Sequence, residues 1–179
     1  PIYALVNNAG FSVDADVKTM TAEMIDDHFA VNMRAPMLLC KEFVQRWKRT
    51  EFESGKIINL TSGYPVEANP GNLQYSSTKA GMDRFSARLA SELADTGITV
   101  NSIDPGPTDT GWMSPESREK LLASSPAGRL GTTEDVAKLF EFLLSDGSRW
   151  ITGQVIHSRG GSQIYLHGKL AAVDMRFTA

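Results

Sequence analysis

Short apolar runs alternate along this chain with longer stretches in which apolar and polar residues follow a helical spacing. The apolar runs are continuous, which is typical of strands buried on both faces of a parallel sheet. Helical stretches between such strands predict an α/β fold with crossover helices. The predicted strands are 2–6, 56–60, 98–103 and 153–157, and the predicted helices are 22–48, 74–95, a short one at 114–125, and a last one that ends near 144.

Local signals mark where these helices begin, bend and end. Thr21 is suited to cap the first helix, and either Thr132 or Thr133 is suited to cap the last one. Pro36 inside the first helix predicts a kink or a break, because proline lacks a backbone N–H. Gly97 is a good stop for the second long helix. The chain contains no internal repeat and no interdomain linker, so these signals describe one domain.

Length and composition are those of an ordinary globular domain. The 179 residues are enough for one hydrophobic core, and 41% hydrophobic with 22% charged residues is an average balance. A net charge of −3 argues against a nucleic-acid-binding surface. No apolar run approaches the length of a membrane-spanning helix. Neither a nucleic acid nor a membrane is therefore expected as a partner.

The cysteine and histidine content predicts neither a disulfide nor a metal centre. Cys40 is the single cysteine and falls in an apolar helical stretch, so a buried free thiol is expected. His28, His157 and His167 are scattered and form no cluster with metal-ligand spacing. A reducing, cytoplasmic location fits this content best.

Tyr75 and Lys79 carry the most specific chemistry in the chain. Residues four apart share one face of a helix, so the Lys79 ammonium would lie beside the Tyr75 phenol. A nearby positive charge favours the phenolate, which predicts a Tyr75 pKa below its reference value of about 10. Such a phenol can exchange a proton with a carbonyl or alcohol oxygen near neutral pH. Ser62, at the end of a predicted strand, would hydrogen-bond the same oxygen.

A Tyr-x-x-x-Lys pair alone is more often a tyrosine packed on a lysine stem at a helix surface. Further motifs change that interpretation: Asn-Asn-Ala-Gly at 7–10 follows the first strand, Val-Asn at 31–32 lies in the first helix, and Pro-Gly at 105–106 follows the third strand. Together with Ser62, Tyr75 and Lys79 they have the order and spacing of the short-chain dehydrogenase/reductase family. The chain resembles that family from its first residues to about Gly161.

This resemblance implies a doubly wound, Rossmann-type α/β fold in partial form, without its first three strands. Family members begin with a strand and a glycine-rich turn, where a pyrophosphate meets a helix N-terminus. No such turn occurs here, so the chain starts at what would be the fourth strand. Residues 1–161 would be the C-terminal part of a single domain. Residues 162–179 extend past the usual family end as a tail of unclear role.

By the same resemblance, the catalytic residues would be Asn32, Ser62, Tyr75 and Lys79. Tyr75 would be the acid/base, Ser62 would orient the substrate oxygen, and Lys79 would tune Tyr75. The family residue that matches Asn32 opens its helix locally and holds a water in a proton relay. An asparagine that simply bonds the backbone at a kink would explain the same residue. Ser62, rather than its neighbour Thr61, has the family spacing to Tyr75.

The resemblance also implies a nicotinamide cofactor, NADP or NAD, at the ends of the strands. The stretch 7–10 could equally be a turn that only ends a strand; by resemblance, Asn8, Ala9 and Gly10 line the adenosine side and Asn7 braces the central sheet. Lys79 would also hold the nicotinamide ribose. The residues implied to contact the cofactor are Asn8, Ala9, Gly10, Tyr75, Lys79, Pro105, Gly106, Thr108 and Thr110.

The loop 105–110 would by composition be a turn, and the resemblance makes it the nicotinamide-side loop. Asp104 and Asp109 are interpreted as turn and cap residues. Three side chains would flank the mouth of the substrate site: Tyr64, Trp112 and Met113.

The implied activity is hydride transfer between a nicotinamide and a carbonyl or secondary alcohol, on a small molecule or an acyl thioester. The pattern is most similar to 3-oxoacyl-[acyl-carrier-protein] reductases. The two long helices would pair between subunits, which predicts a homodimer or homotetramer. The alternative is a catalytically inactive, truncated member that acts only as an assembly or interaction module, and a cofactor-binding titration separates the two.

Overall fold

The computed structural model describes residues 2–48, 51–63, 71–111 and 113–162. Its centre is a sheet of four parallel strands in the order β1-β2-β3-β6. The parallel order confirms the predicted sheet, and β1 lies at one edge of it. The strands are β1 (Ala4–Asn7), β2 (Gly55–Leu60), β3 (Ile98–Asp104) and β6 (Val155–His157).

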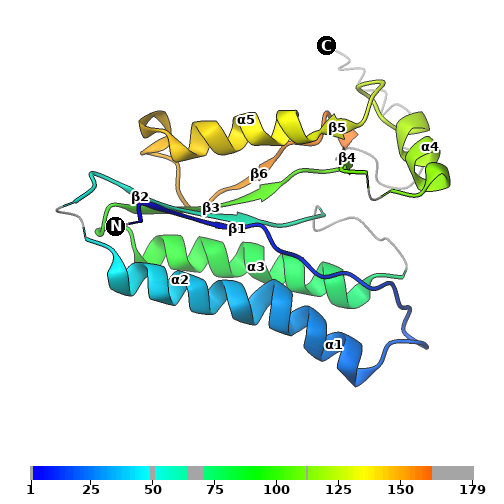
Figure 1. Ribbon diagram of the computed structural model, residues 1–179, viewed down its shortest axis with the longest axis horizontal. Helices are drawn as coiled ribbons and strands as arrows, with labels where there is room; N and C mark the ends of the chain where they lie inside the picture. Colours follow the sequence, from blue (N-terminus) through cyan, green and yellow to red (C-terminus); the bar gives the residue numbers. More distant parts are fainter. Residues whose placement is uncertain (1, 49–50, 64–70, 112, 163–179) are drawn as a thin grey trace, which may run out of the picture.

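Helices cover both faces of this sheet, as Figure 1 shows. One face carries α1 (Ala22–Phe29), a π-helical turn η1 (Ala30–Arg34), α2 (Ala35–Arg46) and α3 (Leu73–Glu92). The other face carries α5 (Thr133–Leu144). Helices on both faces of a parallel sheet define a doubly wound, Rossmann-like α/β fold, as expected.

Smaller elements complete the end of the molecule where the strands finish. Two-residue strands β4 and β5 pair with each other, and neither was predicted. The short helix expected at 114–125 is present as α4. These elements are β4 (Thr108–Asp109), α4 (Pro115–Ala123), β5 (Gly131–Thr132) and the 3₁₀ turn η2 (Asp146–Ser148).

The core has two halves, one on each face of the sheet. Ile57 packs with residues of α2 and α3, and its neighbour Ile58 packs with residues of α5. Successive side chains of a strand point to opposite faces, so a strand covered on both sides needs a continuous apolar run. That requirement explains the run seen in the sequence.

The first long helix is interrupted rather than continuous over 22–48. The Ala35 N–H bonds the carbonyl of Ala30, five residues earlier, which is the hydrogen bond of a π-helical turn. The break predicted from Pro36 is confirmed, although the irregular turn precedes the proline. Pro36 has no N–H to bond the carbonyl of Asn32, so that carbonyl loses its α-helical partner.

The predicted caps and the predicted buried thiol are also present. Thr21 accepts a hydrogen bond from the Met24 N–H, and Thr132 forms a capping box with Asp135. Of the two candidates for the last helix, Thr132 is therefore the cap. Cys40 is 1% exposed, and burial raises its thiol pKa to about 11.

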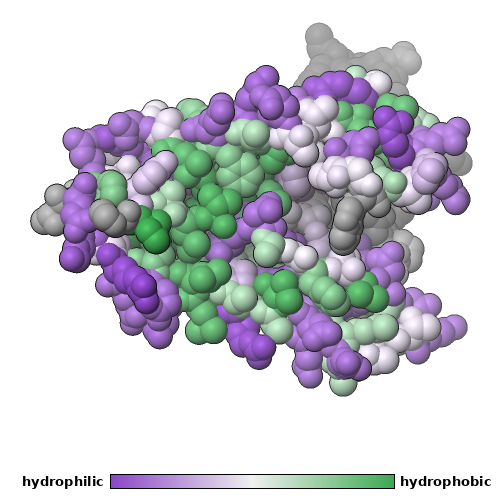
Figure 2. Space-filling view, in the orientation of Figure 1, coloured by the Kyte–Doolittle hydropathy of each residue, from purple (hydrophilic) through white to green (hydrophobic). Residues whose placement is uncertain are grey.

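Apolar side chains remain exposed along β1 and on the helices. Ile2 is 72% exposed and Val6 is 40% exposed at the sheet edge, while Phe29, Leu38 and Leu39 project from the helical layer. Figure 2 shows apolar side chains gathered over the β1 edge between α5 and α2. None of the helices in the described parts of the chain is long and apolar enough to cross a membrane.

Candidate active site

The candidate residues gather at one edge of the sheet because all four strands run in the same direction. Asn8 follows β1, Ser62 lies two residues beyond β2, Pro105 follows β3 and Ser158 follows β6. The carboxyl ends of parallel strands form the usual binding edge of an open α/β sheet. Helix α3 brings Tyr75 and Lys79 to the same edge.

Tyr75 and Lys79 lie one turn apart near the start of α3. The Lys79 Nζ atom is 5.6 Å from the centre of the Tyr75 ring. Lys79 is only 4% exposed, and its Nζ donates a hydrogen bond of 2.9 Å to the carbonyl of Leu60. Ser62 lies within hydrogen-bonding reach of the half-buried Tyr75. Strand β2 and helix α3 thus bring the three predicted side chains together.

Thr61 and Ser62 have different surroundings, although either could be mistaken for the other in the sequence. Thr61 is 2% exposed and donates to the carbonyl of Ile103 at 3.3 Å, which ties β2 to β3. Ser62 is half-buried and interacts with Tyr75. The geometry therefore favours Ser62 as the residue available to a substrate.

The predicted lowering of the Tyr75 pKa is wrong for this structure. Burial raises the pKa of Tyr75 above its usual value, and the negative charge of Asp104 raises it further. The hydrogen bond with Ser62 lowers this pKa, but by less than burial raises it. Burial also lowers the pKa of Lys79, which Asp83 raises in part. Desolvation disfavours the charged form of each group, and here it is the largest influence on both pKa values.

Asn32 is 2% exposed in the π-helical turn, and its side chain is fully engaged. Its Oδ1 accepts from the Phe11 N–H at 2.8 Å, and its Nδ2 donates to the Phe11 carbonyl at 2.9 Å and to the Thr78 hydroxyl at 3.1 Å. The sequence left two interpretations of Asn32, a relay residue that opens its helix and an asparagine that bonds the backbone at a kink. Both expect an irregular helix at this position, and the π-helical turn confirms it.

The stretch after β1 lies directly against this site. Asn8, Ala9 and Gly10 are exposed, and a Cβ atom on Gly10 would lie 3.5 Å from Lys79 Nζ. Asn7 is buried and donates to the side chain of Asn59 on β2 at 2.7 Å. The predicted bracing role of Asn7 is confirmed.

The loop after β3 is held mainly by its own hydrogen bonds. The Gly106 N–H donates to Asp104 Oδ1 at 3.0 Å, and the Thr108 hydroxyl donates to the Pro105 carbonyl at 3.0 Å. Asp109 accepts from the Gly111 N–H and from Arg118, whereas Thr110 is exposed. The turn and cap roles expected of Asp104 and Asp109 are therefore confirmed.

Asp104 has a second role that sequence reasoning missed. Its side chain is 1% exposed, and its Oδ2 lies 2.9 Å from His157 Nδ1 and 3.5 Å from Arg159 Nε. Arg159 in turn packs so closely on Gly106 that a Cβ there would lie 2.7 Å from the Arg159 Cγ. The sequence does place a carboxylate at the end of a buried strand, and carboxylates are rarely buried without a partner. That position could have indicated that Asp104 has a buried partner.

Asp83 also belongs to the surroundings of the site and was not predicted. It follows Lys79 by one turn of α3, with the buried hydroxyls of Thr61 and Ser102 facing it. Burial raises the Asp83 pKa and these hydroxyls lower it, although neither Ser102 Oγ nor Asp83 Oδ1 completes a well-aligned hydrogen bond. Its spacing from Lys79 was visible in the sequence.

A cavity of about 550 Å³ opens beside Ser62. It lies between the loop after β3, the end of α4 and the segment after β6. Met113, expected at the substrate mouth, is not among the described residues that line it, and Tyr64 and Trp112 lie outside the described residues, as does the tail from 163. The lining residues are Ser62, Pro105, Gly106, Pro107, Leu121, Ser124, Ser125, Ala127, Arg129, Leu130, Gly131, Asp135, Ser158, Arg159, Gly160 and Ser162.

Among the described residues, no group of three or more histidine, cysteine, aspartate or glutamate side chains is placed to hold a metal ion.

Comparison with known proteins finds similarity to a reductase family and to individual oxidoreductases. Residues 1–163 match a family described as enoyl-(acyl carrier protein) reductase. An uncharacterized oxidoreductase, YjdA, of Bacillus subtilis is 48% identical over 157 residues, which cover 88% of this chain and 62% of that protein. The 3-oxoacyl-[acyl-carrier-protein] reductase FabG of Haemophilus influenzae is 39% identical over 160 residues, covering 88% of this chain and 65% of that protein.

A solved structure has the same fold over most of the described chain. The angucycline C-6 ketoreductase LanV with bound NADP matches with a TM-score of 0.84 at 33% identity, covering 91% of this chain and 63% of that one. The chain belongs to the short-chain dehydrogenase/reductase family. It spans less than two thirds of the length of these relatives.

Members of this family use NAD or NADP, and the described residues fit part of such a cofactor. A Cβ atom at Gly10 would lie 3.5 Å from Lys79 Nζ, so the backbone after β1 comes close to this lysine. An ammonium group has three N–H donors, and the Leu60 carbonyl accepts from one of them. Lys79 is therefore equipped to bind further hydroxyl groups at this edge.

Proposed function

We propose that this chain carries the catalytic part of an NAD(P)-dependent oxidoreductase that interconverts a carbonyl and a secondary alcohol. The observation that carries the proposal is the meeting of Ser62, Tyr75 and Lys79 at the carboxyl edge of the sheet. One hydroxyl can bind the reacting oxygen while the phenol exchanges a proton with it. The bound nicotinamide supplies or accepts the hydride.

Each side chain has a distinct part in this proposal. Tyr75 donates its proton to the substrate oxygen in the direction of reduction, and its raised pKa keeps the phenol protonated until then. Ser62 donates a hydrogen bond to the same oxygen. Lys79 stabilises the phenolate that forms, and the main-chain carbonyl of Asn32 orients a water that returns the proton.

The cofactor would lie across the ends of the strands. Lys79 and Tyr75 would hold the nicotinamide ribose, and the exposed stretch Asn8, Ala9 and Gly10 would line the adenosine side. The loop after β3, with Pro105, Gly106, Thr108 and Thr110, would border the nicotinamide. The Gly106 N–H and the Thr108 hydroxyl already bond within the loop, so cofactor contacts there need other groups or a rearrangement.

A 3-oxoacyl thioester on acyl carrier protein is the substrate class that we propose first. The similarity to FabG supports it, and so does the cavity of about 550 Å³ beside Ser62. The similarity to the ketoreductase LanV supports small polycyclic ketones as the competing class. A cytoplasmic homodimer or homotetramer is part of the same proposal.

A second candidate function is a non-catalytic assembly module. The exposed apolar side chains on β1, α1 and α2 favour it, because large exposed apolar patches usually mark interfaces. Such a module would need neither cofactor nor phenol, so cofactor binding distinguishes the two functions.

The test is the consumption of NADPH or NADH by the purified protein in the presence of 3-oxoacyl thioesters and small ketones. Tyr75→Phe should lower turnover roughly a hundred- to ten-thousand-fold, because only the hydroxyl transfers the proton. Tyr3→Phe is the matched control, since Tyr3 precedes β1 at the opposite end of the strands. Equal turnover in Tyr75→Phe and Tyr3→Phe would contradict the assignment.

A further inference from the structure

The segment between β1 and α1 is held by side chains at Phe11 and Val13, and by a backbone hydrogen bond from Ala15 to the carbonyl of Gly71. Gln74 Nε2 donates to the Val13 carbonyl at 2.6 Å, and the Val13 N–H donates to His28 Nε2 at 3.1 Å. Two residues earlier, the amide of Asn32 bonds both the N–H and the carbonyl of Phe11. All four backbone polar groups of these two residues are thus satisfied by three side chains.

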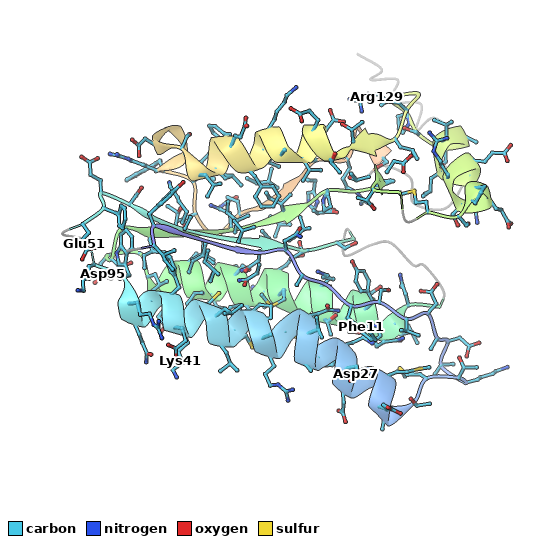
Figure 3. The ribbon with its side chains drawn as sticks, in the orientation of Figure 1. Phe11, Asp27, Lys41, Glu51, Asp95 and Arg129 are labelled. Carbon is cyan, nitrogen blue, oxygen red and sulfur yellow. The ribbon has the colours of Figure 1, made fainter. Side chains whose placement is uncertain are left out.

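The three side chains come from three different helical elements and are all buried. His28 of α1 is 0% exposed, Asn32 of η1 is 2% exposed, and Gln74 of α3 is 3% exposed. Buried polar side chains are costly unless they are hydrogen-bonded. Figure 3 labels Phe11 on this segment and Asp27 on the nearby helix α1. The segment is therefore fastened to three helical elements on the face of the sheet that carries Tyr75 and Lys79.

The network fixes the tautomer of His28. The Val13 N–H can only donate, so His28 Nε2 must carry no proton and the neutral ring holds its proton on Nδ1. That nitrogen lies 2.6 Å from the Met24 carbonyl, which can accept a hydrogen bond from it. The ring also packs edge-on against Phe11, with centroids 4.9 Å apart. His28 thus holds the segment through Nε2 and through its ring, while Nδ1 fixes the ring to helix α1.

The same network touches the proposed catalytic residues directly. Gln74 is the residue before Tyr75, and Asn32 bonds the Thr78 hydroxyl, which donates to the Tyr75 carbonyl at 2.7 Å. Gly10, just before the segment, lies across from Lys79 Nζ. A shift of the segment would therefore move Gly10 relative to Lys79, and both residues are proposed to border the cofactor.

We propose that His28 and Gln74 are positioning residues, which clamp the backbone at Val13 so that Gly10 stays in register with Tyr75 and Lys79. This inference rests on the proposed function for its effect on catalysis. The clamp itself is a property of the folded chain. Through the clamp, His28 would affect catalysis although the described interactions include no contact between His28 and Tyr75 or Lys79.

The clamp is tested by substitutions that remove the hydrogen bonds of one side chain and keep its volume; for His28→Phe these include the bond to the Met24 carbonyl. His28→Phe removes the acceptor for the Val13 N–H, whereas His28→Gln can place Oε1 where Nε2 was. Gln74→Met removes the donor to the Val13 carbonyl. Asp27→Asn, on the exposed side of the same helix as His28, is the control. Amide hydrogen exchange at Val13 and the steady-state constants kcat and KM for NADPH are measured for each.

We expect His28→Phe to speed exchange at Val13 roughly tenfold or more, because the amide loses its buried hydrogen-bond acceptor. The kcat should fall and the KM for NADPH should rise, each by roughly tenfold, and His28→Gln should restore both. Gln74→Met should show the same pattern, which keeps the test valid if His28→Phe fails to fold. Asp27→Asn should leave all three quantities unchanged.

Unchanged exchange at Val13 in both folded variants would overturn the clamp. Faster exchange with unchanged kcat and KM would overturn its role in positioning the site. If the parent protein oxidises no NADPH with any carbonyl, the proposed function fails, and the exchange data still decide whether the clamp exists.

Discussion

The Nζ atom of Lys79 lies 5.6 Å from the centre of the Tyr75 ring while it donates a hydrogen bond to the carbonyl of Leu60. The lysine is thus tied to the end of strand β2 and faces the phenol at the same time. Burial raises the pKa of Tyr75 and lowers that of Lys79, so the site favours a neutral phenol and penalises the ammonium. Asp83, one turn further along α3, raises the pKa of Lys79 and so opposes the lowering caused by burial.

The first prediction concerns Asp83. Because its carboxylate raises the Lys79 pKa, Asp83→Asn should let Lys79 lose its proton at a lower pH. The alkaline limb of the kcat profile should therefore move to lower pH. At acidic pH, where the Asp83 carboxyl is itself protonated, the two proteins should agree.

A ¹³C NMR titration of the Lys79 side chain checks this prediction without any need for activity. Asp83→Glu is the matched variant, since it keeps the charge and should keep the pH at which Lys79 titrates. A Lys79 titration that is the same in Asp83→Asn as in the parent protein would show that the two groups are not coupled.

The second prediction concerns Lys56, which is 1% exposed in β2 and donates to the Ser148 hydroxyl at 3.2 Å. Burial lowers its pKa, so the folded protein binds the Lys56 proton less tightly than the unfolded chain does. The buried Lys56 charge therefore lowers the free energy of unfolding at neutral pH. This loss of stability disappears as the pH rises through the folded pKa toward the unfolded value of about 10.4. Lys56→Met should therefore be more stable than the parent at neutral pH.

Urea unfolding of both proteins across the pH range measures this difference. The stability advantage of Lys56→Met should shrink as the pH increases, because the parent gains stability as Lys56 becomes neutral. A substitution that destabilises equally at every pH would mean that the bond to Ser148 matters more than the charge.

The third prediction concerns Gly106 in the loop after β3. Its φ of +60° lies in the left-handed region, and a Cβ there would lie 2.7 Å from the Arg159 side chain. Gly106→Ala should cost about 1–2 kcal/mol for the backbone conformation, and a further amount for displacing Arg159 from Asp104. Gly128→Ala is the matched control, since Gly128 has a φ of +67° and a Cβ there would meet none of the described atoms within 4 Å.

Thermal unfolding of the two alanine variants separates these contributions. Gly106→Ala should unfold at a lower temperature than Gly128→Ala, and the difference measures the packing of Arg159. Equal midpoints would show that Arg159 adapts without loss.

How far the sequence predicts this molecule depends on whether a feature is local. The strands could be predicted because Ile57 and Ile58 are buried on opposite faces, which leaves a continuous apolar run. The meeting of Ser62, Tyr75 and Lys79 followed from motif spacing and the resemblance. The direction of the Tyr75 pKa shift could not be predicted in this way, because burial comes from the tertiary structure and is the largest influence on that pKa.

Long-range hydrogen bonds account for the other misses. Pro36 indicated a break, but the hydrogen bonds between Asn32 and Phe11, which are 21 residues apart, accompany the π-helical turn. The hydrogen bond between the Asp104 and His157 side chains spans 53 residues. Pairings of this kind form only when β3 and β6 lie side by side, and no local pattern reports them.

The fourth prediction concerns assembly of the 179-residue chain. Ile2 and Val6 expose apolar surface on the edge strand β1, and Phe29, Leu38 and Leu39 do so on the helical layer. Open strand edges and apolar faces promote pairing with another chain. Light scattering should therefore find a dimer, a tetramer or a larger species, and a monodisperse monomer at micromolar concentration would contradict the prediction.

The central claim is that Ser62, Tyr75 and Lys79 serve hydride transfer between a nicotinamide and a carbonyl. Transfer of deuterium from NADPH labelled at C4 of the nicotinamide to a 3-oxoacyl thioester or a ketone, followed by mass spectrometry of the alcohol, tests it most directly. The account predicts one deuterium on the carbinol carbon with the parent protein and none above background with Tyr75→Phe. A product without deuterium, or equal labelling by Tyr75→Phe, would contradict it.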